Sequence, residues 1–148
     1  MDKIGIEGVL LNKMSIIDHQ DGNIFHLMRN FDAGFCGFGE AYISTIKKNS
    51  IKGWKKHNLM TCNFLVPIGS IKIVLYDNRP NSITKGETQE FTLSNKNYQR
   101  LTIPSGIWYG FKGIDENVNY LVNISNMTHQ KTEQENCNLD EFEIKYNW

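Results

Sequence analysis

The sequence predicts an all-β domain, because its apolar residues fall in short runs and no segment keeps a helical period for three turns. Gly, Asn, Asp and Pro separate the runs, and Asp21-Gly22 is a strong hairpin signal. About ten such runs at even spacing favour a β-sandwich or a β-barrel, the latter removing exposed sheet edges by closure.

The expected strands are rich in Val, Ile, Thr and aromatic residues, and several alternate between apolar and polar positions. They cover residues 4–11, 23–28, 41–46, 52–57, 63–67, 70–76, 90–93, 99–103, 119–124 and 142–148. Helix should be confined to short pieces, for example around 32–35 or 131–136. No linker or repeat divides the chain, so residues 1–148 are expected to form a single domain.

The charge balance excludes two broad classes of partner. Lys plus Arg number 16 and Asp plus Glu also number 16, so we expect neither nucleic acid nor an anionic membrane surface as a partner. An anionic ligand would therefore have to be held by a local cluster of cations.

The cysteines and the N-terminus both indicate a cytoplasmic location. Cys36, Cys62 and Cys137 are odd in number and form no Cys-x-x-Cys motif, which favours reduced thiols over disulfides or a zinc site. The start of the chain has no signal-peptide pattern, and no window approaches 18 apolar residues.

One ordered set of motifs is more specific than the strand count. It consists of Lys52-Gly53-Trp54-Lys55-Lys56-His57, Asp77-Asn78-Arg79 with Ser82-Ile83-Thr84-Lys85-Gly86, Pro104-Ser105-Gly106 with Gly110-Phe111, and Trp148. This set resembles the dTDP-4-dehydrorhamnose 3,5-epimerase family, a branch of the cupins. That family carries an Arg-Gly-Leu-His-like segment, an Asp-x-Arg…Ser-x-Thr-x-Gly turn and a Pro-x-Gly-x-x-His-Gly-Phe segment. The resemblance extends from about Ile4 to Trp148.

The resemblance implies a cupin-type double-stranded β-helix, or jelly-roll barrel, with minimal helix. It also implies a nucleotide-diphosphate sugar as ligand, no metal or other cofactor, and a homodimer in which N-terminal strands extend across to the partner subunit. The apolar run 4–11 is suited to that contact.

The catalytic positions depart from the family pattern, as in a short, divergent branch. Lys55 stands where the family has a histidine as general base, and Tyr109 stands at the histidine of His-Gly-Phe. The tyrosine that serves the family as general acid falls near Val122, which cannot donate a proton.

The chain nevertheless offers substitutes. A 4-keto group makes the C3 and C5 protons of a hexose acidic, so an epimerase needs a base, an acid and a group that stabilises the enolate. Gly53, Lys55 and His57 share one strand face; a buried lysine can act as a base, and histidine titrates near neutral pH. Tyr109 can replace the missing acid. The alternative is a solvated Lys55 and a core or surface His57.

Other residues are candidates for binding substrate. Lys52 stands where the family has an arginine, and we expect it to contact the diphosphate. Trp54 and Trp108 are expected to stack on the nucleobase or to line the site beside the sugar, although core packing explains Trp108 equally well. Arg79 is a candidate substrate contact, but an ion pair with Asp77 that braces the turn is favoured.

A metal site is not expected. Cupins that bind metal use a His-x-His…Glu…His set, and here the pair is Lys55-x-His57. His129 and Glu133 follow the last long strand, where supporting or subunit-contact roles are favoured over catalysis.

Three functional hypotheses remain open on the sequence alone. The first is an epimerase that inverts C3, or C3 and C5, of a nucleotide-diphospho-4-keto-6-deoxyhexose in surface polysaccharide synthesis, with a 3,4-ketoisomerase as a near variant. The second is a catalytically divergent protein that binds a sugar nucleotide without turnover. The third is a metal-dependent cupin oxidase or isomerase.

Overall fold

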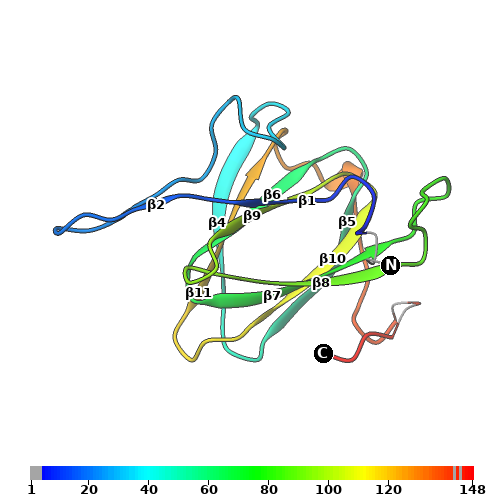
Figure 1. Cartoon of the computed structure of the whole chain (residues 1–148). Helices are drawn as coiled ribbons and strands as arrows, with labels where there is room; N and C mark the ends of the chain where they lie inside the picture. The colour runs from blue at the N-terminus through cyan, green and yellow to red at the C-terminus, as the bar shows by residue number, and fades with distance from the viewer. Residues whose placement is uncertain (1–4, 142, 144) are drawn as a thin grey trace.

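The structure is a computed structural model that describes residues 5–141, 143 and 145–148 (Figure 1). Two antiparallel five-stranded sheets and one two-stranded hairpin account for its strands. The first sheet contains, in spatial order, β1 (Leu10–Lys13), β9 (Gln99–Ile103), β6 (Cys62–Ile68), β11 (Asn119–Ser125) and β4 (Glu40–Ile46). The second contains β12 (Gln134–Asn136), β5 (Ile51–His57), β10 (Ile107–Gly113), β7 (Ser70–Asp77) and β8 (Thr88–Ser94).

The hairpin of β2 (Ile16–Ile17) and β3 (Ile24–Phe25) extends away from the body of the molecule (Figure 1). The 3-10 helix η1 (Lys131–Glu133) lies directly before β12. The all-β prediction is therefore confirmed. Among the described residues, none belongs to a helix with the length and apolar character needed to cross a membrane.

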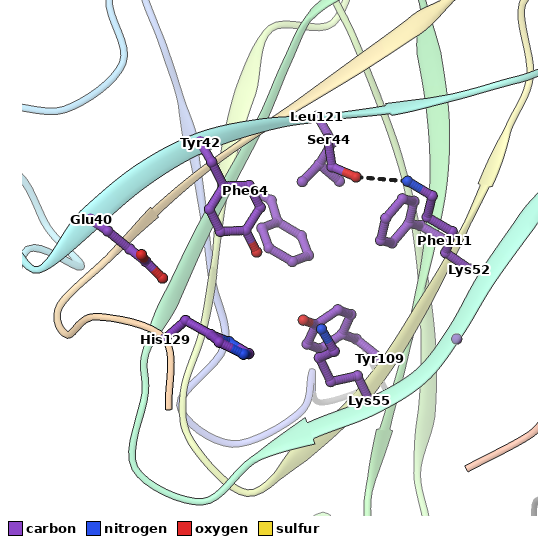
Figure 2. Close-up of a pocket in the computed structure, with 11 residues that line it drawn as sticks. Glu40, Tyr42, Ser44, Lys52, Lys55, Phe64, Tyr109, Phe111, Leu121 and His129 are labelled. Carbon is purple, nitrogen blue, oxygen red and sulfur yellow. Dashed lines mark hydrogen bonds between the residues drawn. The ribbon is translucent and has the colours of Figure 1, made fainter. Parts of the chain in front are cut away.

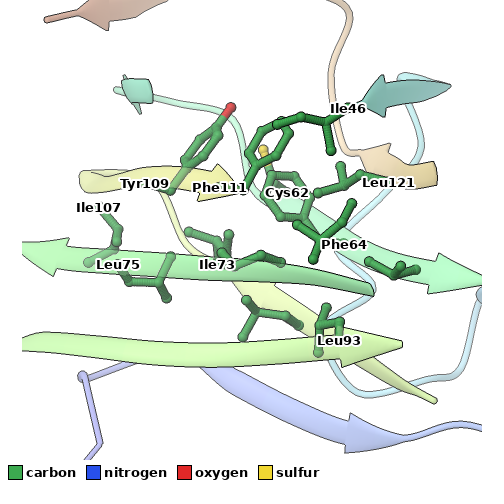
Figure 3. Close-up of a cluster of buried hydrophobic side chains, with 14 of the residues drawn as sticks. Ile46, Cys62, Phe64, Ile73, Leu75, Leu93, Ile107, Tyr109, Phe111 and Leu121 are labelled. Carbon is green, nitrogen blue, oxygen red and sulfur yellow. The ribbon is translucent and has the colours of Figure 1, made fainter. Parts of the chain in front are cut away.

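The core lies between the two sheets and explains the alternating pattern. Inward-facing residues of both sheets, including Phe64, Ile73, Leu101 and Ile107, form one buried cluster (Figure 3). The packing is that of a jelly roll, whose inner faces supply the core and whose outer residues alternate with them.

Each sheet is also covered on part of its outer face. Trp54, Val74 and Tyr76 form a second buried cluster beneath Tyr146 and Trp148 of the C-terminal segment. On the other sheet, Leu65, Tyr98, Val122 and Ile124 pack against residues of the hairpin segment, among them Met14 and Phe25. Burial on both faces accounts for the continuous apolar runs in β6 and β7, because such strands need no polar side.

Several outer elements differ from those predicted from the sequence. The strand expected at 4–11 begins only at Leu10, and Ile4 lies outside the described residues. The strand expected at 23–28 is limited to Ile24–Phe25. The expected helix at 32–35 is a turn, and 131–136 splits into η1 and β12.

The strand predicted at the C-terminus was wrong for the residues that can be judged. Residues 145–148 form no strand, and 142 and 144 lie outside the described residues. The aromatic side chains of Tyr146 and Trp148 instead pack edge-to-face on the outer sheet surface, with ring centroids 4.9 Å apart. The apolar pattern of this segment therefore reflects side chains that pack on the face of a sheet, and not a strand that pairs within a sheet.

Candidate functional site

A cavity of about 470 Å³ opens between the two sheets (Figure 2). The second sheet contributes Lys52, Gly53, Lys55, Tyr109 and Phe111 to its wall. The first sheet contributes Glu40, Tyr42, Ser44, Phe64 and Leu121, and His129 comes from the segment after β11. The cavity is thus lined by apolar side chains such as Phe64, Phe111 and Leu121 together with several convergent polar groups, as small-molecule sites commonly are.

Lys55 and Tyr109 lie opposite each other on neighbouring strands of the second sheet. They are register partners in the antiparallel pair of β5 and β10. Both side chains point into the cavity from the same wall (Figure 2).

An irregularity in β5 lets a second lysine reach the same cavity. Tyr109 pairs with Lys55 but Gly110 pairs with Gly53, so Trp54 is an extra residue in the ladder, as in a β-bulge. Lys52 and Lys55, which regular alternation would place on opposite faces, therefore both line the cavity. Trp54 is directed into the outer cluster instead.

A buried chain of polar contacts supports Tyr109 from behind. His57 Nε2 lies 3.3 Å from the Tyr109 hydroxyl, and His57 Nδ1 contacts Glu133 Oε1. Glu133 Oε2 accepts hydrogen bonds from the backbone N–H groups of Leu59 and Met60 at 3.1 and 3.2 Å. These contacts fix the carboxylate, which in turn fixes the imidazole.

The protonation states follow from burial and from these contacts. Burial lowers the pKa of His57, although the Glu133 carboxylate opposes that shift. Burial would raise the pKa of Glu133, but the hydrogen bonds from His57, Leu59 and Met60 outweigh it and lower that pKa. Burial raises the pKa of Tyr109 well above its ordinary value. A neutral imidazole that donates from Nδ1 to Glu133 can therefore accept the Tyr109 proton at Nε2.

Lys52 supplies a cation on another part of the cavity wall. Its Nζ donates hydrogen bonds to Ser44 Oγ at 2.9 Å and to the Thr45 carbonyl at 2.8 Å. It also lies 5.9 Å from the centre of the Phe111 ring. The Lys52 ammonium group is exposed and is held in place by these hydrogen bonds. It is therefore positioned to contact an anionic group of a ligand.

The first sheet presents a polar face to the cavity. Glu40, Tyr42 and Ser44 alternate along β4 and line the cavity, while the intervening Ile43 points outward and is exposed. Sequence reasoning identified the β4 strand but named none of these three as site residues. An inward-facing polar stripe on an otherwise apolar strand is the signal that could have revealed them.

Four of the seven predicted site residues come together and three lie elsewhere. Lys52, Lys55 and Tyr109 line the cavity, and His57 lies one layer behind Tyr109. Trp54 is buried in the outer cluster, with the partly buried Trp108 packed against it. Lys56 Nζ lies 5.2 Å from the centre of the Trp108 ring on that outer face. The substrate contacts expected of the two tryptophans stay predictions, and this cavity does not include them.

Arg79 forms the ion pair with Asp77 that the sequence favours. Its Nε donates to Asp77 Oδ1 at 2.9 Å and its NH2 group to Oδ2 at 3.0 Å. The same NH2 group donates to the carbonyl of Glu7 at 2.6 Å, and Thr84 Oγ1 donates to Asp77 Oδ2 at 2.7 Å. Arg79 thereby ties the turn after β7 to the N-terminal segment, away from the cavity, and its predicted contact with substrate stays untested.

The described residues contain no group of three or more His, Cys, Asp and Glu side chains arranged to hold a metal ion. At the cavity, Lys55 stands beside His57 on β5, and an ammonium group is not a metal ligand.

Comparison with known proteins gives a consistent result across the chain. The family model for dTDP-4-dehydrorhamnose 3,5-epimerase matches residues 3–148. The spore coat polysaccharide biosynthesis protein SpsL of Bacillus subtilis is 27% identical over 145 residues, which is 97% of this chain and 96% of SpsL. A probable low-salt glycan biosynthesis epimerase of Haloferax volcanii is 32% identical over 84 residues, 56% of this chain and 54% of that protein.

A solved structure agrees with the fold. The crystal structure of a dTDP sugar isomerase from Desulfovibrio desulfuricans superimposes with a TM-score of 0.89 at 35% identity, covering 93% of this chain and 90% of that one. The cupin-type jelly roll expected from the motifs is thereby confirmed.

Proposed function

Because the chain belongs to the dTDP-4-dehydrorhamnose 3,5-epimerase family, we propose that it epimerises a nucleotide-diphospho-4-keto-6-deoxyhexose through an enolate. The inversion is at C3, or at C3 and C5. The observation that carries this proposal is the pairing of Lys55 and Tyr109 on one cavity wall, with His57 and Glu133 behind the phenol.

The four side chains divide the first half of the reaction between them. The Tyr109 oxygen takes the proton from the sugar carbon while its own proton passes to His57 Nε2, and Glu133 stabilises the resulting imidazolium. The electron pair of the broken C–H bond becomes the enolate, whose charge lies on the C4 oxygen. The Lys55 ammonium, on the same wall, stabilises that oxygen.

Lys52 is the proposed contact for the diphosphate. Its hydrogen bonds to Ser44 and Thr45 hold the ammonium at the cavity wall before any ligand arrives. A lysine meets phosphate as a point charge, so it contributes attraction with less directional control than an arginine.

The biological role proposed here is deoxysugar synthesis for a surface polysaccharide. The similarity to a spore coat polysaccharide protein and to a glycan biosynthesis epimerase supports it. We place the reaction in the cytoplasm, and the free thiols of Cys36, Cys62 and Cys137 are consistent with that compartment.

We also propose a homodimer. The run 4–11 is the segment expected to cross to the partner subunit, and β1, which overlaps it, pairs with β9 of its own chain at the edge of the first sheet. The hairpin of β2 and β3 is the better candidate, because it extends from the body and leaves Ile17 and Ile24 47% and 56% exposed. Light scattering at micromolar concentration should report twice the chain mass; a monomer would contradict this proposal.

The reaction is tested by proton NMR of candidate dTDP-4-keto-6-deoxyhexoses in deuterium oxide. We expect deuterium to enter at C3, or at C3 and C5, with accumulation of the epimer. A product with its ketone at C3 would instead identify a 3,4-ketoisomerase, which uses the same enolate. Binding of these nucleotides without exchange of any carbon-bound proton would identify a non-catalytic binder and refute both enzymatic functions.

A further inference from the structure

Inversion of a carbon requires proton transfer on both faces of the sugar. In the cavity, the proposed base Tyr109 and the proposed enolate-stabilising Lys55 both belong to the second sheet, where they are register partners on β10 and β5. A donor for the return of a proton to the opposite face must come from the opposite wall, which β4 and β11 form.

Tyr42 presents a phenol on that opposite wall. Its hydroxyl points into the cavity, across from the side chains of Lys55 and Tyr109 (Figure 2). Ser44, its neighbour on the same face of β4, already accepts a hydrogen bond from Lys52. Val122, near which the family's acidic tyrosine falls, packs on the outer face of the sheet and cannot reach the cavity.

The residue after Val122 holds the Tyr42 phenol in one orientation. Asn123 is the register partner of Tyr42 in the pair of β4 and β11, and its Nδ2 donates to the Tyr42 hydroxyl at 3.1 Å. The backbone N–H of Asn63 donates to Asn123 Oδ1 at 3.2 Å, so the amide cannot turn round without losing that bond. Since the phenol oxygen accepts from Asn123, its hydrogen is left for a group in the cavity.

We propose that Tyr42 donates the proton that completes the inversion, and that Asn123 positions it. The inference rests on the proposed epimerase function and assigns the second half of that reaction. The family's phenol on β11 is then replaced by one on the adjacent strand, β4, directly across the ladder.

The proton balance closes. Tyr42 O–H gives its proton to C3 from the face opposite Tyr109, the enolate electrons form the new C–H bond, and the C4 carbonyl returns. The Tyr42 phenolate, hydrogen-bonded by Asn123, takes a proton from water. His57 releases to water the proton that it received from Tyr109. The Asn123 hydrogen bond favours the phenolate, against the burial that raises the pKa of Tyr42.

The test separates proton removal from inversion. Tyr42→Phe in deuterium oxide should still exchange the C3 proton within a few-fold of the wild-type rate, with deuterium returned to the same face. The inverted product should form at least about 100-fold more slowly. The matched control is Tyr120→Phe, which removes a phenol from the face of β11 directed away from the cavity and should leave both rates unchanged.

A second variant keeps the shape of the site. Asn123→Asp retains the acceptor for the Asn63 N–H but makes the phenol donate to a carboxylate instead of to the ligand. Inversion should fall by about 10-fold or more while exchange continues. Its control is Asn126→Asp, which keeps the Oδ1 that accepts from the backbone N–H of Thr61 at 2.9 Å.

The outcomes distinguish the two proposals. A wild-type protein that exchanges no proton on these substrates refutes the epimerase function itself. A wild-type protein that inverts C3, together with Tyr42→Phe and Asn123→Asp variants that invert at the wild-type rate, overturns the role of Tyr42 alone. Equal loss of exchange and inversion in the folded variants, or loss of inversion in Glu40→Gln with Tyr42→Phe unaffected, also overturns it.

Discussion

The hydroxyl group of Tyr109 lies 3.3 Å from Nε2 of His57, and this contact joins the cavity to the buried carboxylate of Glu133, which is not among the residues that line it. In the proposed reaction this contact gives the imidazole an indirect role. His57 shares the inward face of β5 with Lys55, as strand alternation requires, but it contacts Tyr109 and is not among the residues that line the cavity. The arrangement follows the logic of catalytic triads, in which a fixed carboxylate orients an imidazole that exchanges a proton with the reacting oxygen.

The first prediction concerns the pH dependence of turnover. The proposed proton transfer from Tyr109 needs a neutral His57, and burial lowers the pKa of this side chain below its ordinary value of about 6.5. Because the pKa is lowered, kcat should stay level as pH falls through 6.5 and should decline only at lower pH. Steady-state rates across the acid range test this; a decline centred at or above pH 6.5 would contradict a buried neutral imidazole.

The same shift predicts how His57 affects stability. The unfolded chain binds a proton at pH values where the folded His57 does not, so stability is undiminished above about pH 6.5 and falls as pH drops toward the lowered pKa. The midpoint of urea unfolding, followed across this range, should fall less steeply in His57→Gln. An identical pH dependence in the variant would contradict the shift.

The second prediction tests Glu133 as a positioning residue. Glu133→Gln removes the charge that stabilises the imidazolium, so kcat should fall by about 100-fold. Because the Glu133 hydrogen bond raises the pKa of His57, its loss should also move the acid limb of the rate profile to lower pH. Glu135→Gln, which breaks the outer ion pair with Lys56, is the control. A lower rate with an unmoved acid limb would indicate a purely structural role.

The third prediction concerns two adjacent lysines. Lys55 lines the cavity, whereas Lys56 lies on the outer face, paired with Glu135 at 2.9 Å. Lys55→Met should lower kcat by about 100-fold to 1000-fold, the usual loss when one stabilising donor is removed from an oxyanion. Lys56→Met should leave kcat within a few-fold of wild type. Equal effects of the two substitutions would refute the assignment of Lys55 to the enolate.

The fourth prediction is about stability away from the cavity. Asp77 is fully buried and accepts hydrogen bonds from Arg79, Ser82 and Thr84. Burial would raise its pKa, but these bonds together hold the pKa well below its ordinary value. Asp77→Asn leaves Arg79 without its charged partner and should cost about 3 kcal/mol.

For a domain of this size that loss corresponds to a fall in Tm of about 10 °C. Differential scanning calorimetry measures it, with the exposed Asp18→Asn as a control that should leave Tm unchanged. Nucleotide binding by the folded variant should be retained. If the variant instead loses nucleotide binding while its Tm is unchanged, the turn that holds Arg79 would contact the substrate.

The central strands could be predicted because each carries its own local signal. Residues 41–46, 70–76 and 99–103 have the β-branched, bounded pattern of strands, and β4, β7 and β9 lie there within a residue or two. The outer elements could not, because the apolar residues of the C-terminal segment and of 23–28 pack against sheet surfaces. The spacing of apolar residues alone does not show whether a segment pairs as a strand within a sheet or packs its side chains against the face of a sheet.

Within the site, the residue types could be predicted but not their arrangement. The motifs singled out Lys55, His57 and Tyr109. In the structure Lys55 pairs with Tyr109 and His57 contacts the Tyr109 hydroxyl, while their catalytic roles stay predictions. Regular strand alternation alone would place the Lys52 and Lys55 side chains on opposite faces of β5. The extra residue Trp54 in the ladder with β10 reverses this, and its ring is held against Trp148, 5.5 Å away between ring centroids.

By itself, the sequence determined an all-β chain, since turn chemistry and strand alternation are local properties that each segment carries alone, and the jelly-roll frame followed from its resemblance to a known family. Only the tertiary structure decided which groups share the cavity. Tyr42 meets Asn123, and Glu133 meets His57, through the register of strands far apart in the chain. That register is set by which face of each strand is buried and by the geometry of the turns, and no single segment encodes it.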